Sequence, residues 1–310
     1  KSVRSFRSDL ALESSALAGG AQVAGVRMEQ LRLGDLTETV VEIVDERGVS
    51  ALDKPCGRYV TLESNQMHLA EPALSDMIVD RLSETLSGML PELGSVLVIG
   101  LGNRRITADS LGPRVVDSIL VTRHMRENTP TPVKGRLRCV AAMSPGVLGV
   151  TGMETAEVVR GIVEHTKPDA VIAVDALAAK ETGRICTTMQ IADTGIAPGS
   201  GVGNHRMGLN EETLGVKVIA LGVPMVVYAA TIARDALELL VEDLSTDQEE
   251  HRGALDALVD RVVARRLGDL VVTPREVDER VAHMADMLAL GINRALQPRL
   301  SKDEIPALLH

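Results

Sequence analysis

"VLVIGLGNRRITADSLGPRVVDSI", residues 96–119, contains the features that decide the fold. Four aliphatic residues, 96–99, are typical of a buried strand, and a glycine turn, 100–103, follows them directly. A helix is expected to begin near Leu111. Because a strand, a glycine turn and a helix in this order are typical of nucleotide-binding proteins, the first question is whether the turn holds a phosphate.

The sequence lacks both common phosphate-binding motifs. The dinucleotide fingerprint requires a third glycine, and Arg105 stands at that position. The segment between Gly100 and Leu111 is also too long for a tight pyrophosphate turn. The pattern GxxxxGK[ST] is absent, and no convincing strand directly precedes the second glycine-rich segment, 198–204. We therefore expect no nucleotide site.

The flanking sequence predicts an α/β fold whose mainly parallel sheet is covered by helices on both faces. Aliphatic runs alternate with amphipathic segments. We expect strands at 37–46, 57–64, 95–100, 136–142, 169–177 and 217–223, and helices at 71–91, 111–125, 155–166 and 229–244. The expected organisation is a mobile leader at 1–20, an α/β domain at 21–244 with an N-terminal β-rich insertion, and an appended helical extension at 245–310.

Composition excludes several functions. The net charge of −10 argues against a general polyanion binder, and the chain has only two Tyr, one Phe and no Trp, too few for base stacking. The three cysteines have no CxxC spacing, which predicts neither a disulfide framework nor a zinc cluster. We expect an intracellular protein with no membrane segment and no direct contact with nucleic acid.

Two acids follow predicted strands. Asp109 comes after the turn at 100–103, and Asp175 interrupts the apolar run at 169–177. Because ligands and catalysis in open α/β sheets gather at the carboxyl ends of strands, these acids can meet and divide the roles of acid and base. The alternative is that Asp109 caps the following helix and Asp175 caps a turn.

Longer stretches of the chain resemble the germination proteases of spore-forming bacteria, which degrade small acid-soluble spore proteins. The resemblance extends from about residue 5 to residue 242. The stretches are "RSDLALE" (7–13), "KPCGRYVTLE" (54–63), residues 96–124, residues 144–179, "TTMQIADTGIAPGSGVGNHR" (187–206) and residues 215–237.

The resemblance implies a fold similar to that of the hydrogenase-maturation peptidases. It also implies an unusual aspartic endopeptidase, with Asp109 and Asp175 as the catalytic pair and no metal or other cofactor. Candidates for binding the oxyanion or substrate are Asn103, Gly199, Gly201 and Gly203. The implied setting is the cytoplasm of the forespore or spore core, with spore proteins as substrates and a homotetrameric assembly.

Two other functions are weighed against this one. A metal-dependent maturation peptidase would use both acids and a histidine, but Ala197 stands where the family often has histidine. An inactive scaffold that kept the fold is the third possibility, and retention of both acids argues against it. His124 and His205 are expected to be surface or packing residues.

The leader, "KSVRSFRSDLALESS", resembles the propeptide that family members remove largely by themselves. We therefore expect self-cleavage between Asp9 and Leu10, with the leader entering the active site as an extended strand. Its basic residues Lys1, Arg4 and Arg7 are expected to hold it on an acidic surface. Because acid protonates that surface, processing should accelerate as the pH falls below neutral.

Overall fold

The computed structural model describes residues 9–17, 23–125, 135–197, 207–233 and 270–309, together with Ala236 and Leu267. Within these residues the strands form one sheet in the order β1-β2-β3-β7-β8-β6-β4-β5, and β9 pairs with β8. The strands are β1 (Val26–Leu33), β2 (Leu36–Ile43), β3 (Gly57–Glu63), β4 (Val96–Gly100), β5 (Val140–Met143), β6 (Ala170–Ala179), β7 (Thr188–Ala192), β8 (Lys217–Tyr228) and β9 (Val271–Val272).

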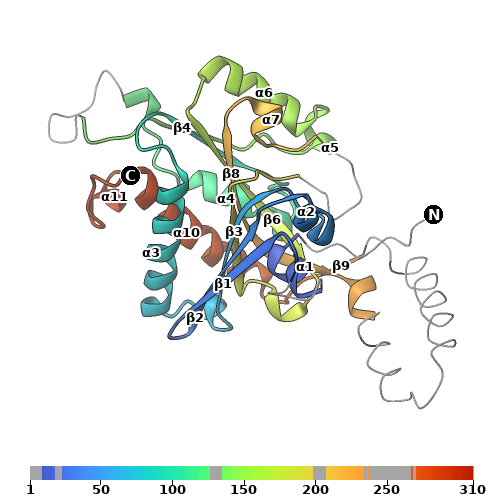
Figure 1. Ribbon diagram of the computed structural model, residues 1–310. Coiled ribbons are helices and arrows are strands. Elements are labelled where there is room, and N and C mark those ends of the chain that lie inside the picture. The colour runs from blue at the N-terminus through green and yellow to red at the C-terminus, as the bar shows by residue number, and fades with distance from the viewer. Residues whose placement is uncertain are drawn as a thin grey trace, which may run out of the picture.

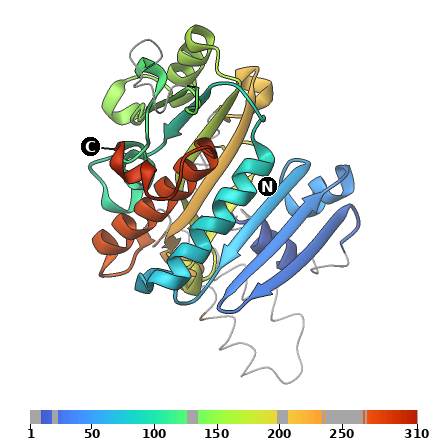
Figure 2. The same ribbon diagram turned by 90° about the vertical axis from the view of Figure 1, so that its left-hand side faces the viewer.

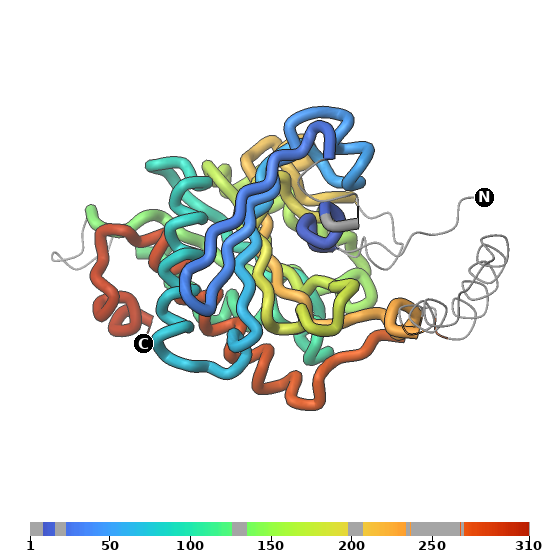
Figure 3. The backbone as a smooth tube through the Cα atoms, turned by 60° about the horizontal axis from the view of Figure 1, so that its bottom comes forward, coloured from blue at the N-terminus to red at the C-terminus, as the bar shows by residue number. Residues whose placement is uncertain are grey.

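The sheet has two halves with different strand directions. β8, β6, β4 and β5 are parallel neighbours, whereas β1, β2, β3, β7 and β8 pair antiparallel in that order. Figure 3 shows the long β1–β2 hairpin in blue beside β3. This antiparallel half contains the predicted N-terminal β-rich insertion. The predicted α/β fold, a sheet with parallel strands and helices around it, is confirmed, and the sheet as a whole is mixed.

Helices cover both faces of the parallel half (Figure 1). The α-helices are α1 (Ala11–Leu17), α2 (Glu46–Leu52), α3 (Pro72–Met89), α4 (Leu111–Asp117), α5 (Leu148–Thr151), α6 (Thr155–Thr166), α7 (Glu211–Leu214), α10 (Val277–Leu296) and α11 (Glu304–Ala307). Short 3-10 helices are η2 (Met67–Leu69), η3 (Thr107–Asp109), η4 (Arg123–Met125) and η5 (Thr182–Arg184). Alternate residues of β4 face opposite cores: Val96 and Val98 join α3 and α10, while Leu97 and Ile99 join α6 and α7.

Several predicted elements differ in extent from the observed ones. The predicted strand at 217–223 continues through Pro224 to Tyr228, because a bulge between β6 and β8 accommodates the proline, which has no N–H to donate. The predicted helix at 111–125 ends at Asp117. β1 was not predicted: as an edge strand it is mostly exposed and has no strong apolar alternation. β7 was not predicted either; it ends at Ala192, and residues 193–197 separate it from the second glycine-rich segment.

The C-terminal helix α10 belongs to the main core, although residues 245–310 were expected to form an appended bundle. Figure 2 shows α10 beside α3 across the sheet, and most of its apolar residues are buried in the same cluster as β6 and β8. Asn293 of α10 is 1% exposed, accepts from the N–H of Leu120 at 2.9 Å and donates to the carbonyl of Ser118 at 2.8 Å. The helical prediction is confirmed for α10, and the boundary at residue 244 stays a prediction. The described helices include none that could cross a membrane.

Replacing Asn293 tests how firmly α10 is joined to the sheet. Asn293→Ala leaves the buried N–H of Leu120 and carbonyl of Ser118 without this partner, which should lower the free energy of unfolding by about 2 to 4 kcal/mol. Denaturant unfolding measures the change. Asp286→Ala, on the exposed side of the same helix, is the control and should change stability by less than about 0.5 kcal/mol. Equal stability of both variants would contradict the assignment.

Candidate active site

The glycine turn after β4 positions Asp109. Gly100 packs so closely on the start of α4 that a Cβ atom there would lie 2.2 Å from the carbonyl oxygen of Gly112. Gly102 has a φ of +109°, and a Cβ on it would lie 2.1 Å from the Asp109 carbonyl oxygen. The N–H of Asn103 donates to Asp109 Oδ2 at 2.8 Å. The turn therefore binds a carboxylate of the chain itself.

Asp175 lies inside β6 and is 8% exposed. Burial raises the pKa of its carboxyl group well above the usual value near 3.8, and the negative charges of Asp109 and Asp9 raise it further. The N–H of Ala176, which donates to Asp175 Oδ1 at 2.9 Å, acts in the opposite direction. The structure thus brings the two predicted acids into one electrostatic site. The capping alternative is wrong for Asp175, because it lies within a strand.

A third acid, Asp9, reaches this site from the N-terminal segment. The N–H of Ala178 donates to Asp9 Oδ2 at 2.9 Å, and the N–H of Asp9 donates to the Ala178 carbonyl at 3.3 Å. The carbonyl oxygen of Asp9 accepts from Lys54 Nζ and from Gln190 Nε2, each at 3.1 Å. The N–H of Ala11 donates to Gln190 Oε1 at 2.7 Å. Sequence reasoning did not identify Lys54 or Gln190 as site residues.

Apolar burial also holds this segment in place. Leu10 and Ala11 are both 0% exposed, and Leu10 packs in the main core of the sheet. The expectation of a mobile leader is therefore wrong for residues 9–17. The expectation that the leader adopts an extended strand is also wrong for residues 11–17, which form α1. Lys1, Arg4 and Arg7 lie outside the described residues.

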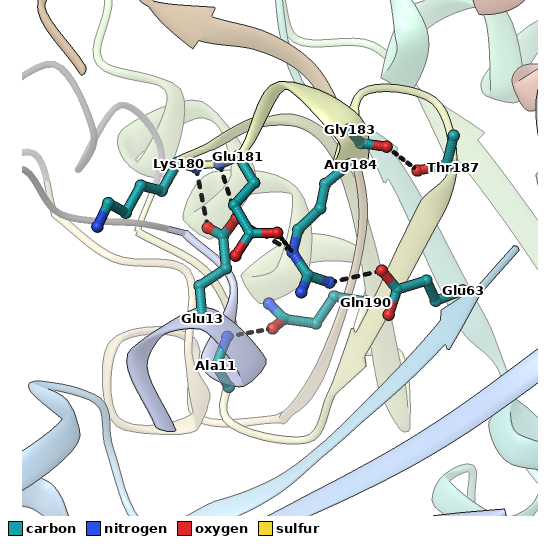
Figure 4. A network of polar contacts seen from close by, with 9 residues as sticks. All are labelled: Ala11, Glu13, Glu63, Lys180, Glu181, Gly183, Arg184, Thr187 and Gln190. Atoms are coloured by element: carbon teal, nitrogen blue, oxygen red, sulfur yellow. Dashed lines mark hydrogen bonds and ion pairs between the residues drawn. The ribbon is translucent and has the colours of Figure 1, made fainter. Parts of the chain in front are cut away.

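Glu13 ties the same segment to the chain after β6 (Figure 4). Its carboxylate is buried, 3% exposed, and accepts from the N–H groups of Lys180 and Glu181 at 2.9 and 3.0 Å. The guanidinium of Arg184 forms an ion pair with Glu13 at 3.2 Å and a second one with Glu63 at 2.8 Å. A buried carboxylate with two N–H donors and a cation is compensated, so these contacts stabilise α1 in its position against the chain after β6.

The predicted oxyanion residues have a different outcome. The backbone N–H of Asn103 is bound to Asp109 and is not directed to a substrate. A role for the Asn103 side chain stays a prediction. Gly199, Gly201 and Gly203 lie outside the described residues.

The described histidines do not form a metal-binding group with the two acids. His124 and His165 are exposed. In the ranges that the structure covers, no three His, Cys, Asp or Glu side chains are grouped closely enough to hold a metal ion. His205 lies outside these ranges, so this observation concerns only the donors that are described.

Comparison with solved structures gives a weak likeness. A [NiFe] hydrogenase maturation protease, HycI from Thermococcus kodakarensis, aligns with 67% of this chain and 98% of its own, with a TM-score of 0.34 and 19% sequence identity.

Comparison of sequences gives a much stronger result. The germination protease of Caldanaerobacter subterraneus subsp. tengcongensis is 43% identical, with 99% of each chain covered. That of Clostridium perfringens is 40% identical over 98% of this chain and 99% of its own, and that of Bacillus licheniformis is 36% identical over 96% and 95%. A family model described as germination protease matches residues 9–263. This chain therefore belongs to the germination protease family.

Proposed function

We propose that the protein is an aspartic-type endopeptidase that begins the degradation of small acid-soluble spore proteins in the spore core during germination. Membership of the family supports a peptidase that acts in spores. The observation that carries the catalytic assignment is the buried carboxyl of Asp175, whose pKa is raised by burial and by the charge of Asp109. Pairs of acids with such different surroundings divide the work of acid and base.

In this mechanism Asp109 is the base and Asp175 the acid. Asp109 takes a proton from water while the water oxygen attacks the peptide carbonyl carbon. Asp175, which holds its proton because its pKa is raised, donates that proton to the leaving amine as the C–N bond breaks. The proton gained by Asp109 passes to Asp175, so the pair ends with one proton, as it began. The N–H of Asn103 donates to Asp109 Oδ2 and holds this carboxylate in position.

The protein is also proposed to be a zymogen that cuts its own chain between Asp9 and Leu10. The contacts of Asp9 support this proposal, because its carboxylate lies close enough to Asp175 to raise the pKa of that acid. Its carbonyl, which belongs to the bond in question, accepts two hydrogen bonds. The segment is therefore already held beside the acids and need not diffuse to them.

Amide substitution tests the acid pair. Asp109→Asn and Asp175→Asn should each reduce peptidase activity by at least about 10²-fold, because proton transfer is lost while the side-chain volume is kept. Hydrolysis of a spore protein, followed by gel electrophoresis, measures the loss, and thermal unfolding checks the fold. Normal turnover by either variant would refute the pair.

Wild-type activity should survive EDTA. Loss of activity on chelation, with recovery when zinc is added, would favour the metal-dependent alternative.

The raised pKa of Asp175 predicts a pH-dependent difference in stability. In the folded protein this acid keeps its proton at pH values where the unfolded chain has lost it. Its contribution is therefore complete below the unfolded pKa, near 3.8, and is lost as pH rises towards the folded pKa. As pH rises across this window, the free energy of unfolding of Asp175→Asn should increase relative to that of the wild type by up to about 1.4 kcal/mol per pH unit. Denaturant unfolding at a series of pH values measures the difference; a constant difference would contradict the assignment.

Self-cleavage should also depend on Asp175. Incubation of the full chain should produce a new N-terminus at Leu10, because Asp175 supplies the proton that the leaving amine needs. N-terminal sequencing and mass spectrometry identify the product. Asp175→Asn should remain intact. Cleavage at the same bond in that variant, or an uncut wild-type chain, would refute self-processing.

A further inference from the structure

Gln190 is a buried amide whose contacts are made with the backbone of the N-terminal segment. It lies on β7 between Thr61 of β3 and Gly222 of β8, and it is 8% exposed. Its Nε2 donates to the carbonyl of Asp9 at 3.1 Å, and its Oε1 accepts from the N–H of Ala11 at 2.7 Å.

These two backbone groups are the pair that a neighbouring strand would bind. In an extended peptide, a carbonyl and the N–H two residues later point to the same side, so an extended substrate presents the same pair of groups. Gln190 binds both and so holds the peptide bond between Asp9 and Leu10 from one side. Since neither contact involves a side chain of the segment, the same amide can hold another peptide of different sequence.

Lys54 approaches the same carbonyl from a rigid turn. Asp53 before it has a left-handed φ of +53°, and Tyr59 donates its hydroxyl to the carbonyl of Pro55 at 2.9 Å. The half-buried ammonium of Lys54 lies 3.1 Å from the Asp9 carbonyl oxygen. One carbonyl oxygen therefore receives a cationic donor and an amide donor together.

We propose that Lys54 and Gln190 are further catalytic residues, which bind the carbonyl oxygen of the bond to be cut and stabilise its negative charge during the reaction. The inference rests on the proposed function and on the bond between Asp9 and Leu10. When the water oxygen bonds to the carbonyl carbon, the C=O electron pair moves to oxygen. The ammonium and the amide N–H are then bound to an oxyanion, to which they bind more strongly than to a neutral carbonyl. As the C–N bond breaks, the carbonyl re-forms and the amine takes the proton of Asp175.

The two residues contribute differently. Lys54 donates to the oxygen where charge develops, so it should act mainly in the transition state and affect kcat. Gln190 also binds the N–H of Ala11, which does not change during the reaction, so it should affect both KM and kcat.

Steady-state kinetics on a synthetic peptide with the sequence of residues 4–15 tests the proposal, with each variant produced with Leu10 as its N-terminus, the form that self-cleavage would leave. Lys54→Met should lower kcat by about 10²- to 10³-fold and change KM little. Lys54→Arg, which keeps the charge, should recover part of the loss. Gln190→Leu should lower kcat and raise KM. Lys302→Met, which removes an exposed lysine that pairs with Asp80, is the control and should match the wild type.

A pH profile separates this role from an indirect one. If Lys54 stabilises the oxyanion, the kcat of Lys54→Met should be lower than that of the wild type at every pH, and its pH profile should keep the same shape. A plateau of normal height, displaced along the pH axis, would show that Lys54 only adjusts the acids and would overturn the proposal. So would unchanged kcat in Lys54→Met while Asp175→Asn is inactive. Activity in Asp175→Asn would instead refute the proposed function itself.

Discussion

The site depends on keeping the carboxyl of Asp175 away from water. β6 is buried on both faces, because helices cover the parallel strands on each side. Asp175 is an acid in this apolar strand. Ionising a carboxyl there is costly, and the charges of Asp109 and Asp9 add to the cost. Burial in this strand therefore favours the protonated form of the acid. The glycine turn, the antiparallel strands and the N-terminal segment are all arranged around it.

The two halves of the sheet have separate tasks in the proposed reaction. The parallel half provides the acids, Asp109 after β4 and Asp175 on β6. The antiparallel half provides the groups that hold the peptide, with Lys54 just before β3 and Gln190 on β7. β7 pairs with β3 on one side and with β8 on the other, so it fixes the distance between these two sets of groups.

The sequence predicted the acids better than their partners, for a physical reason. Asp175 interrupts an apolar run and Asp109 follows a strand and a glycine turn, and such local patterns can be recognised in one sequence. Gln190 resembles any polar residue of a strand until Asp9, 181 positions away, is placed against it. Lys54 had no local signal as a site residue, because its role follows from the path of a segment expected to be mobile. The burial of Leu10 and the ion pair of Glu13 with Arg184 fix that path, and both require the folded sheet.

Cutting the bond between Asp9 and Leu10 would leave most of the docked segment bound. Ala11 would keep its hydrogen bond to Gln190, and Glu13 would keep its two N–H donors and the ion pair with Arg184. Another peptide can use Gln190 only after these contacts are broken. The cut also creates an ammonium group on Leu10, which is 0% exposed in the uncut chain. Burying a new charge is unfavourable unless it is paired, so cleavage weakens the docking of the segment that it releases.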